Sequence, residues 1–258
     1  MNIRRARLAL ATVAGLGLGA ETASAQIDYR NSDTHRPTRV ADAYPVERYA
    51  FEFSLPYGLV TDEGTTRHAV EPHLDYGIAR NVMVGIGADI RVGGPRTEPS
   101  TGSASLLWNL GRETAGSPGM SVAVESQFTS FDRVSVEVGG LFTRSIGRSR
   151  LHGNAAIRIL ESNDLAAALA PDWWAGLAWD YTLLRTSTLL IVELVAERPG
   201  SQRTTEWTFG GGVRRQLTPT VVLHGGVSRS LQGSGTEFNF GLSHTLAIAD
   251  LMGRRGAR

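Results

Sequence analysis

Apolar and polar residues alternate along most of the chain, most plainly in the stretch "NVMVGIGADIRVGG" at 81–94. Here Ile86 and Ile90 fall on one face, while Gly87 and Asp89 fall on the other. A period of two is typical of a β-strand with one apolar face. The pattern therefore predicts a strand, and it leaves open whether the apolar face meets a protein core or lipid.

The same alternation recurs between residues 49 and 248, in segments close to the roughly 9–11 residues that a tilted membrane strand needs. It predicts an all-β fold of about twelve strands, over residues 49–59, 67–79, 82–93, 102–111, 119–130, 134–146, 150–161, 172–184, 188–198, 204–216, 220–231 and 236–248. Tight turns recur about every 35 residues, near Arg80, Arg112, Arg148, Arg185 and Pro219. The other connections tend to be longer and richer in Gly, Pro and charge, an asymmetry typical of outer-membrane barrels.

The composition of the two faces favours a membrane barrel over a soluble sandwich. The polar faces are rich in Gly, Ala, Ser and Thr, and aromatic residues gather toward the strand ends as in the girdles of membrane barrels; these are Tyr49, Tyr57, Tyr76, Trp108, Trp173, Tyr181, Trp207 and Phe238. Because every backbone group must be paired in lipid, such strands have to close. We therefore predict a transmembrane antiparallel up-and-down β-barrel with Ile86 toward lipid and Gly87 toward the lumen. The alternative is a soluble secreted β-protein, in which the apolar face forms the core.

The first 25 residues are typical of a cleavable signal peptide. A basic start is followed by an apolar run over 8–20 and by the triplet Ala23-Ser24-Ala25, which predicts cleavage after Ala25. The alternatives for this stretch are an N-terminal amphipathic helix or a mispredicted start of the chain. Export favours the outer membrane of a Gram-negative cell, with outer-membrane lipid and the barrel-assembly machinery as partners.

The remaining chain divides into three predicted parts. Residues 26–48 are polar, contain two prolines and have no period, so we expect a flexible periplasmic N-terminal segment. Residues 49–248 are the predicted β-barrel, and 249–258 are a C-terminal tail. Since the predicted strand number is even, both ends of the barrel fall on the side of the tight turns, the periplasmic side.

Charge and cysteine content exclude some classes of protein. The net charge is +1, and it is close to −1 without the first 25 residues, which carry three arginines and Glu21. A chain without a basic excess is not expected to bind nucleic acid. An exported chain without cysteine gains no stability from disulfides.

The polar residues of the predicted inner faces are the candidate pore lining. They are Glu52, Glu71, His73, Asp75, Asp89, Arg91, Glu125, Glu137, Arg158, Asp180, Glu193, Glu206 and Arg214. Opposed charges of this kind set selectivity in a channel for a small-molecule solute. They fit equally well an ion-paired network that fills the lumen of a barrel that conducts nothing.

No catalytic, cofactor-binding or metal site is predicted. Glu71, His73 and Asp75 share one face in "EPHLD", but a single histidine among paired charges is more often structural than a zinc ligand. His224 and Ser228 share a face at a separation too long for a nucleophile and its base. A membrane-embedded lipid-modifying enzyme with a non-local triad, or a purely structural barrel, remains the alternative to a channel.

Residues 204–248 carry a family resemblance, in "WTFGGGVRRQLTPTVVLHGGVSRSLQGSGTEFNFGLSHTL". A strand there leads through a short Thr-Pro turn into a Gly-rich strand, a small loop and a final alternating strand. This pattern resembles the outer-membrane barrels grouped with the phenol-degradation MetA-type proteins. The resemblance implies an outer-membrane channel or transporter for small solutes, hydrophobic or aromatic ones included, and no catalytic residue. The chain departs from such barrels where it runs past Ile248 into "ADLMGRRGAR" instead of ending on an aromatic residue.

Overall fold

The computed structural model describes residues 37–62, 64–93, 100–129, 133–160, 172–183, 187–198 and 204–247. The predicted signal peptide at 1–25 and the predicted tail at 249–258 lie outside the described residues. Within them, no helix is long and apolar enough to cross a membrane.

The described part of the chain contains thirteen strand segments. They are β1 (Ala50–Asp62), β2 (Thr65–Val70), β3 (His73–Ala79), β4 (Val82–Gly93), β5 (Thr101–Gly111), β6 (Gly119–Thr129), β7 (Arg133–Ile146), β8 (Ser149–Leu160), β9 (Asp172–Leu183), β10 (Thr188–Arg198), β11 (Glu206–Thr218), β12 (Val221–Ser230) and β13 (Thr236–Ala247). These bounds agree with the predicted spans to within a few residues, except that the predicted strand 67–79 is divided into β2 and β3.

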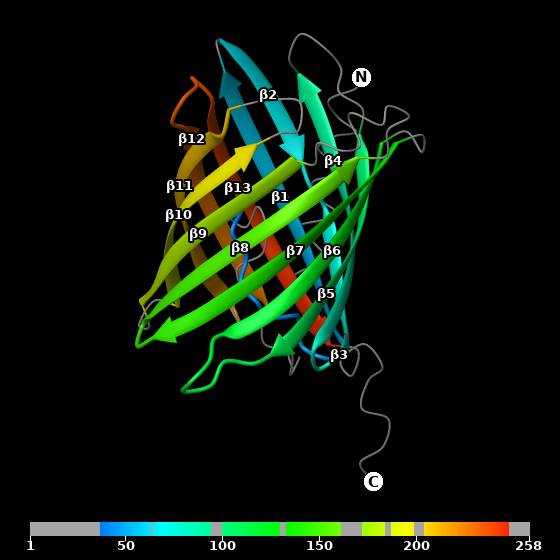
Figure 1. The fold of residues 1–258 in the computed structure, drawn as a ribbon, viewed down its shortest axis with the longest axis vertical. Helices are drawn as coiled ribbons and strands as arrows, with labels where there is room; N and C mark the ends of the chain where they lie inside the picture. The colour runs from blue at the N-terminus through cyan, green and yellow to red at the C-terminus, as the bar shows by residue number, and fades with distance from the viewer. Residues whose placement is uncertain are drawn as a thin grey trace.

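The strands close into a barrel in which each pairs with its sequence neighbour in antiparallel fashion (Figure 1). The ends of the sheet meet where β1 pairs with β13, from Ala50 opposite Ala247 to Thr61 opposite Thr236. Both β2 and β3 pair with β1 on one side and β4 on the other, so the two share one strand position. The described residues thus form a closed barrel with twelve strand positions, and the predicted fold class is confirmed.

Pro72 explains why one strand is divided. Proline has no amide N–H to donate to a neighbouring strand, so it interrupts a β-ladder. The backbone around it remains satisfied, because Glu71 donates to the Pro56 carbonyl and the Pro72 carbonyl accepts from Ala88, both at 3.0 Å. The barrel therefore continues past the break without losing its pairing.

The outer face of the barrel is apolar and the inner face is polar. Ile86 is 61% exposed and Trp108 is 52% exposed on the outer face. Ser54, Asp180 and Arg214, by contrast, are completely buried on the inner face. A soluble sandwich would bury its large apolar residues and expose its charges. The apolar face of the strands therefore points outward and the polar face inward, as a barrel that spans lipid requires.

The two ends of the barrel differ in their connections. Short connections at 80–81, 147–148 and 219–220 lie at the end that we call the turn end, where β1 also begins. The opposite, loop end carries longer connections such as 161–171, which lies outside the described residues. The connection 112–118, at the turn end, is longer than the tight turn that the sequence predicts. There the Arg144 guanidinium donates to three backbone carbonyls, of Thr114, Ala115 and Ser117.

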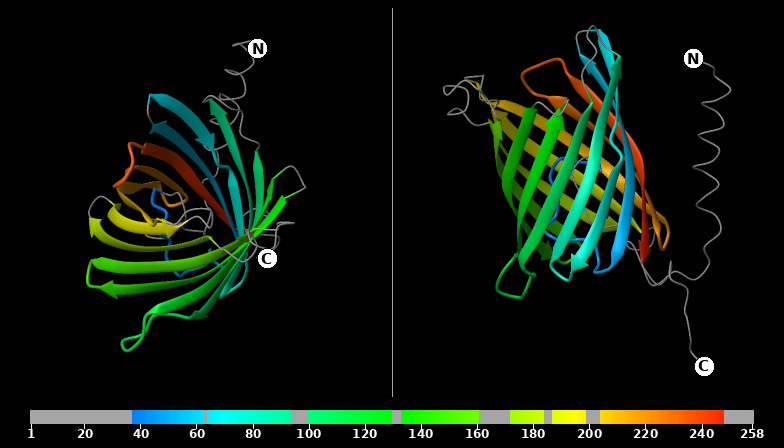
Figure 2. Two further views of the ribbon diagram at one scale, coloured as in Figure 1. Left: turned by 45° about the horizontal axis from the view of Figure 1, so that its top comes forward. Right: turned by 90° about the vertical axis from the view of Figure 1, so that its right-hand side faces the viewer.

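Residues 37–46, which we call the lumenal segment, run inside the barrel (Figure 2). Most of their side chains are buried, including Thr38, Val40, Asp42 and Val46. The sequence predicts a flexible periplasmic segment over 26–48, and for residues 37–46 this prediction is wrong. The physical reason is that polar groups on the inner wall need hydrogen-bond partners, and the backbone of this segment supplies them.

The orientation of β4 predicts the effect of adding a charge to either face. Ile86→Arg is expected to weaken folding into lipid vesicles by about 2–4 kcal/mol, because the charge enters hydrocarbon. Gln127→Arg, on the inner face of β6, is expected to change the free energy of folding into vesicles by only about 0.5 kcal/mol. Gln127 is a better control than Gly87, where an added Cβ would lie 2.5 Å from the His73 ring. Denaturant titrations in vesicles measure both variants, and equal losses would contradict the assigned faces.

Candidate functional site

Side chains of four neighbouring strands hold the middle of the lumenal segment through its backbone. The Asn154 side chain accepts a hydrogen bond from the Ala41 amide at 2.6 Å and donates to the Ala41 carbonyl at 3.0 Å. The Ala43 amide donates to the Thr143 hydroxyl at 3.0 Å. The Ala43 carbonyl accepts from the Asn109 side-chain amide at 2.8 Å and from the Ser121 hydroxyl at 2.5 Å. Side chains of the wall thus bind both amide and carbonyl groups of the segment's backbone.

Glu193 of β10 holds the segment at Arg39 and Val40. Its carboxylate accepts from the Arg39 amide at 3.1 Å and from the Val40 amide at 2.9 Å. The Arg39 guanidinium forms an ion pair of 2.6 Å with Glu197 and lies 4.6 Å from the centre of the Trp174 ring. Hydrogen bonds to a carboxylate are stronger than neutral ones, so this is a firm attachment.

Val40 is one of two apolar anchors of the segment, and the other is Val46, which is buried with Met83 and Leu107. Val40 is completely buried, in a cluster with Leu189, Ile191, Trp174 and other inner-face residues. The wall makes room for it at Gly176 of β9, where a Cβ would lie 2.5 Å from the Val40 Cγ2. A larger residue at this position would therefore meet the segment directly.

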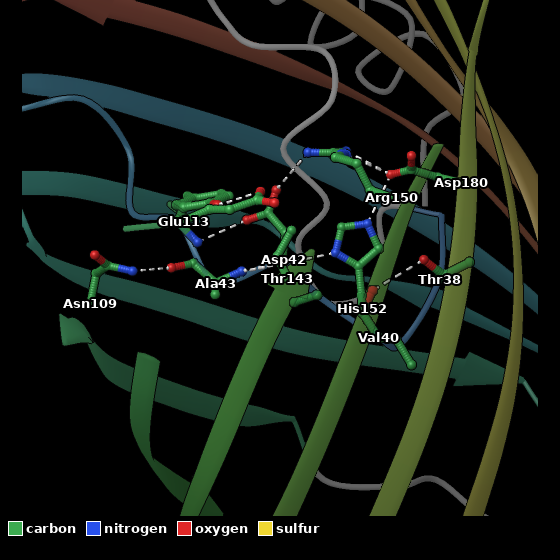
Figure 3. A network of polar contacts seen from close by, with 12 residues as sticks. Thr38, Val40, Asp42, Ala43, Asn109, Glu113, Thr143, Arg150, His152 and Asp180 are labelled. Carbon is green, nitrogen blue, oxygen red and sulfur yellow. Dashed lines mark hydrogen bonds and ion pairs between the residues drawn. The ribbon is translucent and has the colours of Figure 1, made fainter. Parts of the chain in front are cut away.

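A buried network of charges joins the segment to β8 and β9 (Figure 3). The Arg150 guanidinium lies 2.7 Å from the Asp180 carboxylate and 3.6 Å from that of Asp42 in the segment. His152 bonds to the same Asp180 oxygen through Nε2 at 2.8 Å and to the Thr143 hydroxyl through Nδ1 at 3.0 Å. Thr143 is the residue that accepts the Ala43 amide, so the network supports the attachment of the segment.

The chain Thr143–His152–Asp180 has the residue types of a hydrolytic triad but not its accessibility. Thr143 is completely buried, and its hydroxyl oxygen is already engaged by the Ala43 amide. A nucleophile must reach a substrate, and its base must be free to take the proton. The geometry fits a support for the segment better than a catalytic site.

Tyr44 and Val46 lie nearer the turn end. Burial raises the pKa of the Tyr44 phenol above its ordinary value, and the neighbouring Glu113 and Asp42 carboxylates raise it further. The phenol is therefore protonated at neutral pH, and it lies 3.5 Å from the Glu113 carboxylate as a donor. The Val46 amide lies 3.4 Å from the Met83 sulfur.

A cavity of about 610 Å³ occupies the half of the lumen toward the loop end. Its floor is made by Pro37, Thr38 and Arg39 of the lumenal segment. The described residues of its wall are Glu71, His73, Ala88, Asp89, Arg91, Thr101, Ser103, Glu125, Gln127, Thr129, Glu137, Arg158, Trp174, Glu193, Val195, Glu197, Thr208, Ser228, Glu237 and Asn239.

Each arginine that lines the cavity lies in an ion pair with a neighbouring carboxylate. Besides the pair of Arg39 with Glu197, Arg91 lies 2.6 Å from Asp89 and Arg158 lies 2.8 Å from Glu137. The lining includes further carboxylates, among them Glu125 and Glu237. Acidic side chains therefore outnumber basic ones among the described lining residues.

The structure brings eight of the thirteen predicted lining residues together around this cavity. These are Glu71, His73, Asp89, Arg91, Glu125, Glu137, Arg158 and Glu193. Glu52, Asp75, Asp180 and Arg214 are buried on inner faces nearer the turn end, and Glu206 is half-buried at the start of β11. Whether any of them conducts a solute stays a prediction.

Sequence reasoning missed most of the residues that hold the segment, although the predicted set includes Glu193 and Asp180. Arg150, His152 and Asn154 share the inner face of β8 with the predicted Arg158, and the alternation of "SRLHGNAAIR" could have found them. Asp42 and the other residues of the segment have no period that would mark them as lumenal.

The three residues of "EPHLD" do not converge on one site. Glu71 lies in the break between β2 and β3, and it lines the cavity with His73, whereas Asp75 is buried on the inner face of β3. Among the described residues, no group of three or more histidine and carboxylate side chains is arranged to hold a metal ion.

Known proteins match this chain in structure and not in sequence. No family model and no curated protein matches it. The NanC porin covers 74% of this chain and 98% of its own with a TM-score of 0.57 at 8% identity. The KdgM porin in complex with disordered oligogalacturonate has the same coverage, with a TM-score of 0.53 at 10% identity. The COG4313 outer membrane channel from Pseudomonas putida F1 covers 80% of this chain and 97% of its own, with a TM-score of 0.53 at 13% identity.

These neighbours are outer-membrane channels of the same barrel architecture. At such low identity the likeness shows the fold alone. The resemblance to the MetA-type family stays a prediction.

Two ion pairs of different burial predict different effects on stability. Asp180→Ala leaves the buried Arg150 without its closest partner, and we expect it to lower the free energy of unfolding by about 3–5 kcal/mol. Asp89→Ala breaks the partly exposed pair with Arg91, and we expect a loss of about 0–1 kcal/mol. Urea titrations of both variants in one detergent measure the difference. Equal losses would contradict a supporting role for the buried network.

Proposed function

We propose that this protein is an outer-membrane channel that passes small hydrophilic solutes through the lumen of its barrel. The observation that carries the proposal is a charged cavity inside a closed barrel whose outer face is apolar. A lining of polar and charged groups favours passage of hydrated solutes, as in porin lumens.

The membrane location rests on the belt of exposed apolar side chains. Ile86, Phe209 and Ile157 are more than half exposed on the outer face. In water such a belt would drive aggregation, whereas lipid accommodates it, and closure of the sheet leaves no unpaired strand edge. The outer membrane is where closed barrels of this kind span a bilayer.

The lining favours hydrophilic over aromatic solutes. Trp174 is the aromatic side chain among the described lining residues, and most of the others are charged or hydroxyl-bearing. The aromatic solutes implied by the family resemblance would find few apolar contacts in such a cavity. Hydrated small molecules suit it better.

The balance of charge favours cations. The described lining holds more carboxylates than guanidinium groups, and a wall of one sign concentrates ions of the opposite sign. Oligogalacturonate, which the KdgM porin is described as binding, is an acidic oligosaccharide. The lining of this barrel has the charge that would repel it.

Planar-bilayer recordings test the channel. We expect discrete openings, and a reversal potential in a salt gradient that corresponds to a preference for cations. Glu125→Gln with Glu237→Gln removes two charges from the lining, so we expect the preference to fall. Glu47→Gln, exposed at the turn end, is the matched control and should leave the preference unchanged because it lies outside the cavity.

If the wild-type protein shows no openings in these recordings, and variants with substitutions in the lumenal segment show none either, the result would contradict the channel. Silence together with hydrolysis of added lipid would instead favour a membrane-embedded enzyme. A preference for anions in the wild type would contradict the assignment of cationic solutes while leaving the channel in place.

A further inference from the structure

We propose that the lumenal segment, residues 37–46, is a displaceable plug whose departure opens the barrel from end to end. The proposal rests on the channel proposed above and adds how that channel is closed. The segment runs inside the barrel from the cavity floor at Pro37 to Val46, which contacts Met83 toward the turn end. With it in place, the cavity is bounded toward the turn end by the protein's own chain.

Many of the contacts that hold the segment are of a kind that water can replace, although the Glu193 carboxylate and the pair of Asp42 with Arg150 hold it more firmly. Asn109, Ser121, Thr143 and Asn154 hold its backbone with single polar side chains rather than with a β-ladder. When the segment leaves, water can solvate these groups, and the wall keeps its own strand pairing. Two residues of the segment lie in apolar clusters, Val40 with Leu189 and Ile191 and Val46 with Met83 and Leu107. Detachment is therefore a local opening that costs less than unfolding the barrel.

The chain has a hinge where the segment joins the barrel. Tyr49 lies between the segment and β1 and has a φ of 63°, in the left-handed region. This region is unfavourable for a bulky aromatic residue, and such strain persists only while the surrounding structure enforces it. The Tyr49 amide donates to the Gly77 carbonyl at 2.7 Å, which fixes the sharp turn into the lumen. Movement of the segment about this point relieves the strain.

Glycines on the inner wall leave space for the segment, and the strand pairing of the wall does not depend on the segment. A Cβ at Gly176 would meet Val40, and a Cβ at Gly212 would lie 2.5 Å from Pro37. These glycines leave a groove on the inner wall where larger side chains would fill the lumen. When the segment leaves, the groove adds to the width of the passage.

The absence of cysteine allows a direct test of displacement. Val40→Cys places one thiol on a residue that is completely buried in the closed state. We expect a water-soluble maleimide to label Cys-substituted protein in detergent at least roughly ten-fold faster than the barrel unfolds, yet slower than it labels a free peptide thiol. Labelling only as the barrel unfolds would overturn the proposal, and so would labelling at the rate of a free thiol.

A disulfide tests the effect on conductance. In the double variant Val40→Cys with Gly176→Cys, the added Cβ at 176 lies 2.5 Å from the position of the Val40 Cγ2, which brings the two Cβ atoms into disulfide range. We expect the largest openings to become at least roughly ten-fold rarer in the oxidised protein and to return with a reductant. The single variant Val40→Cys under the same reductant is the control. Equal openings in both redox states would overturn the proposal.

The two readouts separate this inference from the proposed function. Intermediate labelling of the barrel, with silence in both redox states, supports a displaceable segment and contradicts the channel. Labelling only on unfolding, in a barrel that conducts, contradicts the displaceable segment and leaves the channel in place.

Discussion

The pairing of β1 with β13 is the interaction on which the rest of the structure depends. It closes the sheet, so that every strand has two neighbours and no edge is left unpaired. Closure also gives the two faces different environments. Large apolar residues such as Ile86 lie outside, and polar residues such as Asp180 lie in a narrow lumen that they must share.

The polar side chains that face the closed lumen need hydrogen-bond partners. Polar side chains such as Asn154 and Thr143 cannot all pair across the barrel, and an unsatisfied buried polar group is costly. The lumenal segment meets this need because its backbone offers an acceptor at every residue and a donor at each residue other than proline. Its position nearer the turn end leaves the loop-end half of the lumen to the charged cavity.

The same arrangement connects stability with function. The network of Asp42, Arg150, Asp180 and His152 stabilises the barrel wall and at the same time holds the segment. In the cavity, ion pairs such as that of Arg158 with Glu137 neutralise the arginines, and the remaining carboxylates set the sign of the lining.

The sequence by itself determined the strands, because a period of two reports directly which face of each strand is apolar. It therefore predicted the barrel, the outward position of Ile86 and the inward positions of residues such as Asp89 and Glu193. Only the tertiary structure decided what fills the lumen. Val40 meets Glu193 across 153 residues of sequence, and Ala41 meets Asn154 across 113. Contacts this distant leave no local pattern, so a segment without periodicity was predicted to be a flexible tail although the closed wall holds it inside.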